Sequence, residues 1–202
     1  LNVFYDKHGI KTINEEALDN EKVLLKLREA IELLRKVKRV YFSIIKLVRS
    51  IQVLKQDYDY IDISYSNPII PCSIFVSVCS DSSIISSLRV AESILHESMH
   101  LKLTLLEGVI DIVKTDTPNV YYSPWRDEKR PAQGVLHGLF VFKAIYDFYD
   151  IIIGELVHEK EAVKYIKNRM KEIREELSTL TYLTSIPELS KEGKELVINL
   201  LK

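Results

Sequence analysis

His96 and His100 are the residues of this sequence whose types and spacing point most directly to chemistry. They stand four residues apart in the segment HESMH, an HExxH motif whose acidic member is Glu97. On a helix, side chains at positions i and i+4 leave the same face one turn apart, so both imidazoles can reach one ion. Neutral imidazole suits zinc, iron, copper and nickel alike. The motif therefore predicts a metal-dependent enzyme.

A site with two histidines is open and weak, and it normally needs a third protein ligand. We expect this ligand to be His137, in the segment GVLHGLF, where Gly134 and Gly138 would let backbone or ligand approach closely. The alternative for His137 is a core histidine between apolar neighbours. Glu107 shares the helical face of His96, but an unbroken helix would place it about 16 Å along the axis. We therefore assign Glu107 no ligand role.

The motif by itself favours a zinc hydrolase. In such an enzyme Glu97 is the general base that takes a proton from metal-bound water before attack on a peptide carbonyl. No glycine turn followed by a histidine occurs within ten residues of His96, so the metzincin arrangement of ligands is absent.

A proline-rich segment, YYSPWRDEKRP, precedes His137 and contains Trp125, Arg126 and Arg130. The succession of HESMHLKL, PWR, RP and HG resembles the HExxH-motif peptide-modification family. Members of this family are 2-oxoglutarate-dependent enzymes that hydroxylate ribosomally made peptides. The resemblance covers residues 71–142, roughly a third of the chain.

The resemblance implies that His96, His100 and His137 bind ferrous iron, Fe(II). It also implies that 2-oxoglutarate is the cosubstrate, a precursor peptide is the partner, and a side-chain β-carbon is hydroxylated. Glu97 would then lie behind the ligands or handle protons, although direct ligation stays open. A zinc-dependent HExxH metallopeptidase remains the alternative.

The far carboxylate of 2-oxoglutarate needs a cation, and a planar, bidentate arginine suits it. Arg130 is our first choice and Arg126 our second, with Trp125 beside them. The alternative is that the two arginines only pair with Asp127, Glu128 or solvent.

Helix signals cover most of the chain, and they set the elements that must position these residues. Apolar residues recur at helical spacing, and glycine and proline are missing from residues 14–56. Alternation over residues 60–79 predicts two strands joined by a turn. Asp81 and Ser82 are expected to cap the helix that carries the motif, and three prolines favour a loop over residues 115–131. The predicted helices cover residues 14–56 with at most one break, 83–114, 132–153, 155–182 and 190–202.

These elements predict a mainly α (α+β) fold, a helical domain with a small antiparallel β element. Two strands alone would be marginal, so we expect them to pack on the HExxH helix, which becomes the central element.

Length and composition limit the classes of protein that fit. A chain of 202 residues is expected to form one domain, residues 1–202. A net charge of -1 argues against a nucleic-acid partner, and no apolar run is long enough to span a membrane. The two cysteines are expected to be free thiols in a cytoplasmic protein. Because the sequence starts at Leu1 rather than Met, we expect an incomplete N-terminal region, and the oligomeric state stays open.

Overall fold

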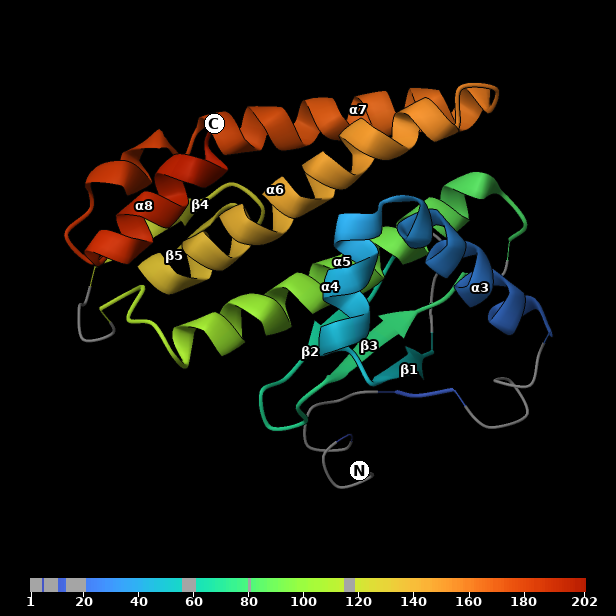
Figure 1. Cartoon of the computed structure of the whole chain (residues 1–202), viewed down its shortest axis with the longest axis horizontal. Coiled ribbons are helices and arrows are strands. Elements are labelled where there is room, and N and C mark those ends of the chain that lie inside the picture. The colour runs from blue at the N-terminus through green and yellow to red at the C-terminus, as the bar shows by residue number, and fades with distance from the viewer. Residues whose placement is uncertain (1–4, 6–10, 14–20, 56–60, 80, 115–118) are drawn as a thin grey trace.

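The computed structural model describes residues 5, 11–13, 21–55, 61–79, 81–114 and 119–202. In this part of the chain it is mainly helical with a small sheet, which confirms the predicted fold class (Figure 1). The first elements along the chain are α3 (Glu21–Lys36), α4 (Lys38–Leu47), β1 (Ser50–Leu54), β2 (Ser64–Ser66), β3 (Ser73–Ser77) and α5 (Ile84–Glu107). The later ones are β4 (Val120–Ser123), β5 (Glu128–Pro131), α6 (Ala132–Glu155), α7 (Lys160–Ser178), the 3-10 helix η1 (Thr181–Ser185) and α8 (Lys191–Leu200).

Helix α5 carries the HExxH motif and is the central element, as predicted. It packs against α3, α4, α6 and α7 and against strands β2 and β3 (Figure 1). Its N-cap is Ser83, whose Oγ accepts the backbone N–H of Ser86 at 3.1 Å. Asp81 Oδ1 accepts the N–H of Ser83 in turn at 2.8 Å. The predicted caps, Asp81 and Ser82, thus lie just outside the helix, and the cap itself is the next serine.

The sheet has one strand more than the sequence predicted. Strands β2 and β3 form the expected antiparallel pair, and β1 pairs with β3 in parallel, giving the order β1-β3-β2. The prediction of a helix to residue 56 is therefore wrong after Leu47, and residues 14–20 of that helix lie outside the described residues. In the middle strand, Ile74, Phe75 and Val76 are fully buried, as expected for a strand covered on both faces.

The segment predicted as a loop contains a hairpin. Strands β4 and β5 pair in antiparallel register, and residues 115–118 lie outside the described residues. Between the strands, Asp127 adopts φ 49°, a left-handed conformation that aspartate tolerates better than most residues. The turn ahead of it places Trp125 and Arg126 at the tip of the hairpin.

The described core consists of two clusters that meet at the level of the motif. On α5 the first cluster reaches Leu101 and the second begins at Leu103, and on α6 the boundary falls between Leu139 and Val141. Both cysteines are free. Among the described helices, none contains a segment of eighteen residues apolar enough to cross a bilayer.

Candidate metal centre

Three histidines predicted as ligands form one cluster between α5 and α6. His96 Nε2 lies 3.1 Å from His100 Nε2, and His100 Nδ1 lies 3.1 Å from His137 Nδ1. The rings of His100 and His137 are stacked, with centroids 5.4 Å apart. The structure therefore brings the HExxH pair and the later histidine together, although they come from different helices.

The HExxH pair has the spacing that a shared ion requires. Two nitrogens at about 2.1 Å from one ion are separated by roughly 3.0–3.4 Å, and the two Nε2 atoms lie 3.1 Å apart. His137 faces the opposite nitrogen of the His100 ring. Across the described residues, no group of three or more His, Cys, Asp or Glu side chains is arranged to hold an ion as it stands. The donor chemistry of the cluster fits a metal, with His96 on one side of the His100 ring and His137 on the other.

Burial keeps two of these imidazoles neutral. It lowers the pKa of His100 to about 3, and the neighbouring His96, His137, Arg130 and Arg126 act in the same direction. Burial also lowers the pKa of His96, against the opposing effect of Glu97. Since a metal needs an unprotonated nitrogen, both side chains are in the ligating form at neutral pH.

Glu97, the acidic residue of the motif, is buried and held by strand β2. Its Oε1 accepts a hydrogen bond from Ser64 and its Oε2 one from Ser66, each at 2.6 Å. Glu97 Oε1 also lies 3.9 Å from His96 Nε2. The carboxylate is therefore fixed beside the histidine pair by two hydroxyl groups that sequence reasoning did not identify.

Glu107 lies in the site, although we assigned it no ligand role from the sequence. Its Oε2 is 3.0 Å from His137 Nε2 and accepts a hydrogen bond from Gln133 at 2.9 Å. Its Oε1 is buried and has no hydrogen-bond partner among the described residues. Burial opposes ionisation, but the contacts with His137 and Gln133 outweigh it and lower the pKa of Glu107. A carboxylate on the outer nitrogen of a ligating histidine fixes its tautomer and orientation.

The arginine-bearing hairpin forms the other wall of the site. Trp125 stacks on Phe142 with centroids 4.8 Å apart and an interplanar angle of 10°, and its ring covers Gly138. Arg126 and Arg130 both line the cavity with the three histidines. The sequence predicted that backbone or a ligand would approach Gly138 closely, whereas the neighbour in the structure is the side chain of Trp125.

The alternative role of the arginines, pairing with nearby acids, is seen only for Arg130. Its Nε lies 3.7 Å from Glu128 Oε1, and both side chains are exposed enough for the pair to contribute little. Arg126 makes no ion pair with any residue that the structure describes.

A group of side chains that sequence reasoning missed packs behind His96. Arg169 on α7 donates to Glu92 on α5 at 2.8 Å, and its guanidinium carbon is 5.5 Å from the ring centre of Phe142. Phe142 meets the ring of His96 edge-on at 5.5 Å. The only sequence signal is that Glu92 lies one helical turn before His96.

Two adjoining cavities surround the histidines. One, of about 590 Å³, lies on the hairpin side. The other, of about 550 Å³, lies on the side of β2. They share Pro68, His96, His100, Thr104, Arg126 and His137. The site is thus one trough between an edge strand and a cationic hairpin, with the histidines at its floor.

No family model and no curated protein matches this sequence. The likeness to the HExxH peptide-modification family therefore rests on the motifs alone. The fold and the site together define an α+β domain with a half-buried histidine cluster at the floor of an open trough.

Proposed function

We propose that this protein is an iron(II)- and 2-oxoglutarate-dependent oxygenase that hydroxylates a side-chain β-carbon of a ribosomally made peptide. The observation that carries the proposal is that three histidines and two arginines line one cavity of about 590 Å³. Histidine clusters alone serve many reactions, and loop arginines alone often pair with neighbours. Together they offer metal ligands and a cation for a dicarboxylate in the same cavity.

His96, His100 and His137 would hold the metal, and ferrous iron, when bound, supplies the activation of dioxygen. The balanced reaction consumes one dioxygen and one 2-oxoglutarate. One oxygen atom enters the C–H bond of the peptide, the other enters succinate, and carbon dioxide is released. The protein's part is to bind and orient the reactants in the trough.

The hairpin residues have distinct tasks in this scheme. Arg130 or Arg126 binds the far carboxylate of 2-oxoglutarate through a planar guanidinium that can donate two parallel hydrogen bonds. The stacked rings of Trp125 and Phe142 form an apolar wall that limits entry of bulk water.

The free edge of β2 supports a peptide as the substrate. Ser77 N–H donates to Ile63 O at 2.7 Å, so in the antiparallel register the alternate residues Ser64 and Ser66 turn their backbone groups to the outer edge. No strand among the described residues pairs with that edge, and it borders the cavity that contains His96. An extended peptide can add to such an edge through main-chain hydrogen bonds.

One observation favours a zinc metallopeptidase as the second candidate. Glu97 Oε1 lies 3.9 Å from His96 Nε2, within the range in which a carboxylate could take a proton from water bound at the histidine pair. This reaction needs zinc and water alone, whereas the oxygenase needs iron, dioxygen and 2-oxoglutarate.

The test is an optical titration of anaerobically purified, iron(II)-loaded protein with 2-oxoglutarate, combined with metal analysis and succinate measurement. Arg130→Ala removes a cavity cation. Lys129→Ala is the matched control, since Lys129 is an exposed cation of the same strand and does not line the cavity.

The oxygenase predicts a charge-transfer band and dioxygen-dependent succinate that weaken in Arg130→Ala and persist in Lys129→Ala. If only Arg126→Ala weakens the band, Arg126 is the binding arginine. Stoichiometric zinc, with no band under any iron loading, would refute the oxygenase and make the peptidase the first candidate.

A further inference from the structure

The arginine-bearing hairpin is held at the start of β4 by the segment that follows η1. Glu188, in this segment, is fully buried. Its Oε1 accepts a hydrogen bond from Asn119 Nδ2 and its Oε2 one from the hydroxyl of Tyr121, both at 2.6 Å. Asn119 and Tyr121 flank the first residue of β4. Both oxygens of a single carboxylate thus accept hydrogen bonds from the start of the hairpin.

The backbone around Glu188 is itself fixed to the chain that leaves α5. Lys114 N–H donates to Glu188 O at 2.8 Å, and Ser190 N–H donates to Ile112 O at 3.0 Å. These contacts hold the backbone around Glu188 on the segment after α5. The Glu188 carboxylate therefore holds the start of strand β4 in a defined position.

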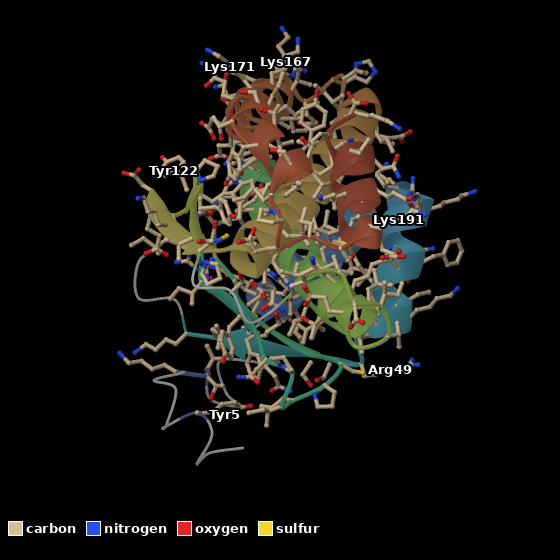
Figure 2. The ribbon with its side chains drawn as sticks, turned by 90° about the vertical axis from the view of Figure 1, so that its left-hand side faces the viewer. Tyr5, Arg49, Tyr122, Lys167, Lys171 and Lys191 are labelled. Carbon is tan, nitrogen blue, oxygen red and sulfur yellow. The ribbon has the colours of Figure 1, made fainter. Side chains whose placement is uncertain are left out.

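Tyr182, from η1, makes a second connection to the same strand. Its ring stacks on Tyr121 with centroids 5.8 Å apart, and its hydroxyl donates to Tyr122 O at 2.7 Å. Figure 2 shows Tyr122 at one side of the molecule, on the hairpin. The C-terminal segment therefore contacts the side chain of one residue of β4 and the backbone of the next.

Such anchoring has a physical reason. A two-stranded hairpin is marginal by itself, so its position depends on what holds it. At its tip the hairpin rests on α6 through Trp125 and Gly138, and at its base it rests on Glu188 and Tyr182. A buried carboxylate is costly in free energy unless it is fully hydrogen-bonded, and here it is bound by two side-chain donors.

We propose that Glu188, assisted by Tyr182, is a positioning residue that sets where Arg126 and Arg130 stand relative to the histidine cluster. The link to 2-oxoglutarate rests on the proposed function, whereas the placement of the hairpin does not. Loss of the Glu188 carboxylate therefore shifts the hairpin and weakens binding of the dicarboxylate, without loss of the metal ligands.

The experiment compares Glu188→Gln with Glu192→Gln, which makes the same charge change on an exposed residue of α8. Trp125 is the single tryptophan of the chain, so its fluorescence reports the hairpin directly. For Glu188→Gln we expect red-shifted, more readily quenched emission and faster amide exchange in β4 and β5. Exchange in α5 and α6 stays as in wild type.

On the iron-loaded protein we expect KM for 2-oxoglutarate to rise about tenfold in Glu188→Gln, as for loss of one good hydrogen-bonding arrangement. We expect kcat and iron(II) affinity to change less than about twofold, a separation that general destabilisation would not give. Glu192→Gln stays at wild-type values throughout.

Unchanged tryptophan emission and hairpin exchange in Glu188→Gln would overturn the proposal. So would equal losses in KM, kcat and iron affinity. If Glu188→Gln does not fold, Tyr182→Phe, which removes only the bond to Tyr122 O, provides the same readouts. If wild type shows no response to 2-oxoglutarate, the proposed function fails, and the emission and exchange data alone decide whether Glu188 positions the hairpin.

Discussion

Replacing Gly138 by alanine should displace the hairpin, because Trp125 occupies the space a side chain would need. A Cβ built at position 138 overlaps Cε3 and Cζ3 of the indole and lies 3.2 Å from Cη2. Carbon atoms pack at about 3.5–4.0 Å, so the indole must move by roughly 1 Å or more. The indole is also stacked on Phe142, so it cannot move without losing that contact.

The size of the effect follows from two opposing terms. Glycine to alanine in a helix interior gains about 1 kcal/mol of stability. Overpacking costs about 1–3 kcal/mol. Gly134, one turn earlier in α6, provides the control, since a Cβ there would meet only the Arg130 side chain, at 3.3 Å, which is flexible and partly exposed. Because Gly134 lies in the first turn of α6, the helix term cancels only in part, and Gly138→Ala should be less stable than Gly134→Ala by up to about 3 kcal/mol.

Thermal unfolding, chemical denaturation and tryptophan emission measure this difference. For a chain of this size 1 kcal/mol corresponds to about 2–4 °C in Tm. We expect Gly134→Ala to match or exceed wild type, and Gly138→Ala to melt lower with altered Trp125 emission. Equal stabilities with unchanged emission would show that Trp125 does not rest on α6 and would refute the described placement of the hairpin.

Three further predictions follow from the site and its surroundings. The unfolded pKa of His100 is near 6.5 and the folded pKa is about 3, so the metal-free protein binds fewer protons than its unfolded state between these values. The contribution of neutral His100 to the free energy of unfolding is fully present above pH 6.5, and it falls by about 2 kcal/mol from pH 7 to pH 5. In urea titrations, the free energy of unfolding of His100→Asn should therefore depend less on pH than that of wild type. Ser66→Pro should weaken binding of an extended peptide more than Ser66→Ala does, because only proline removes the outward N–H; equal affinities by calorimetry would exclude addition of the peptide to β2. Lys26 is buried and donates to Glu29 and Ser87, so Lys26→Met should lower the free energy of unfolding by about 1–3 kcal/mol in chemical denaturation; no loss would show that these hydrogen bonds are dispensable.

Sequence reasoning succeeded for the helices with clear local signals, and it missed strand β1 and the hairpin of β4 and β5. Helices α5, α6 and α8 have caps, proline boundaries and apolar periodicity within their own segments. Strand β1, Ser50–Leu54, has no glycine or proline before it and continues the apolar spacing of α4. It becomes a strand because it pairs in parallel with β3, more than twenty residues later. Pairing between strands that are distant in the sequence overrides local preference, and a short stretch of sequence does not reveal it.

The same distinction applies to the site. The HExxH spacing alone placed His96 and His100 together, because both lie on one helix. The partners of Glu97 were not predictable, since Ser64 and Ser66 lie on a strand some thirty residues away in sequence. Their contact depends on how the sheet packs on α5, which no spacing within the chain encodes.

Glu107 shows why distance along one helix does not decide membership of a site. The rise of 1.5 Å per residue places its Cα about 16 Å beyond that of His96, so we still expect no direct ligation beside His96. His137, arriving from α6, bridges the interval by meeting His100 with one ring nitrogen and Glu107 with the other. Helix α5 thus contributes His96, His100 and Glu107 to the cluster, and His137 of α6 contacts two of them. Glu107 is far from His96 along α5, yet it orients the predicted ligand His137, because α6 crosses α5 and brings His137 into contact with Glu107.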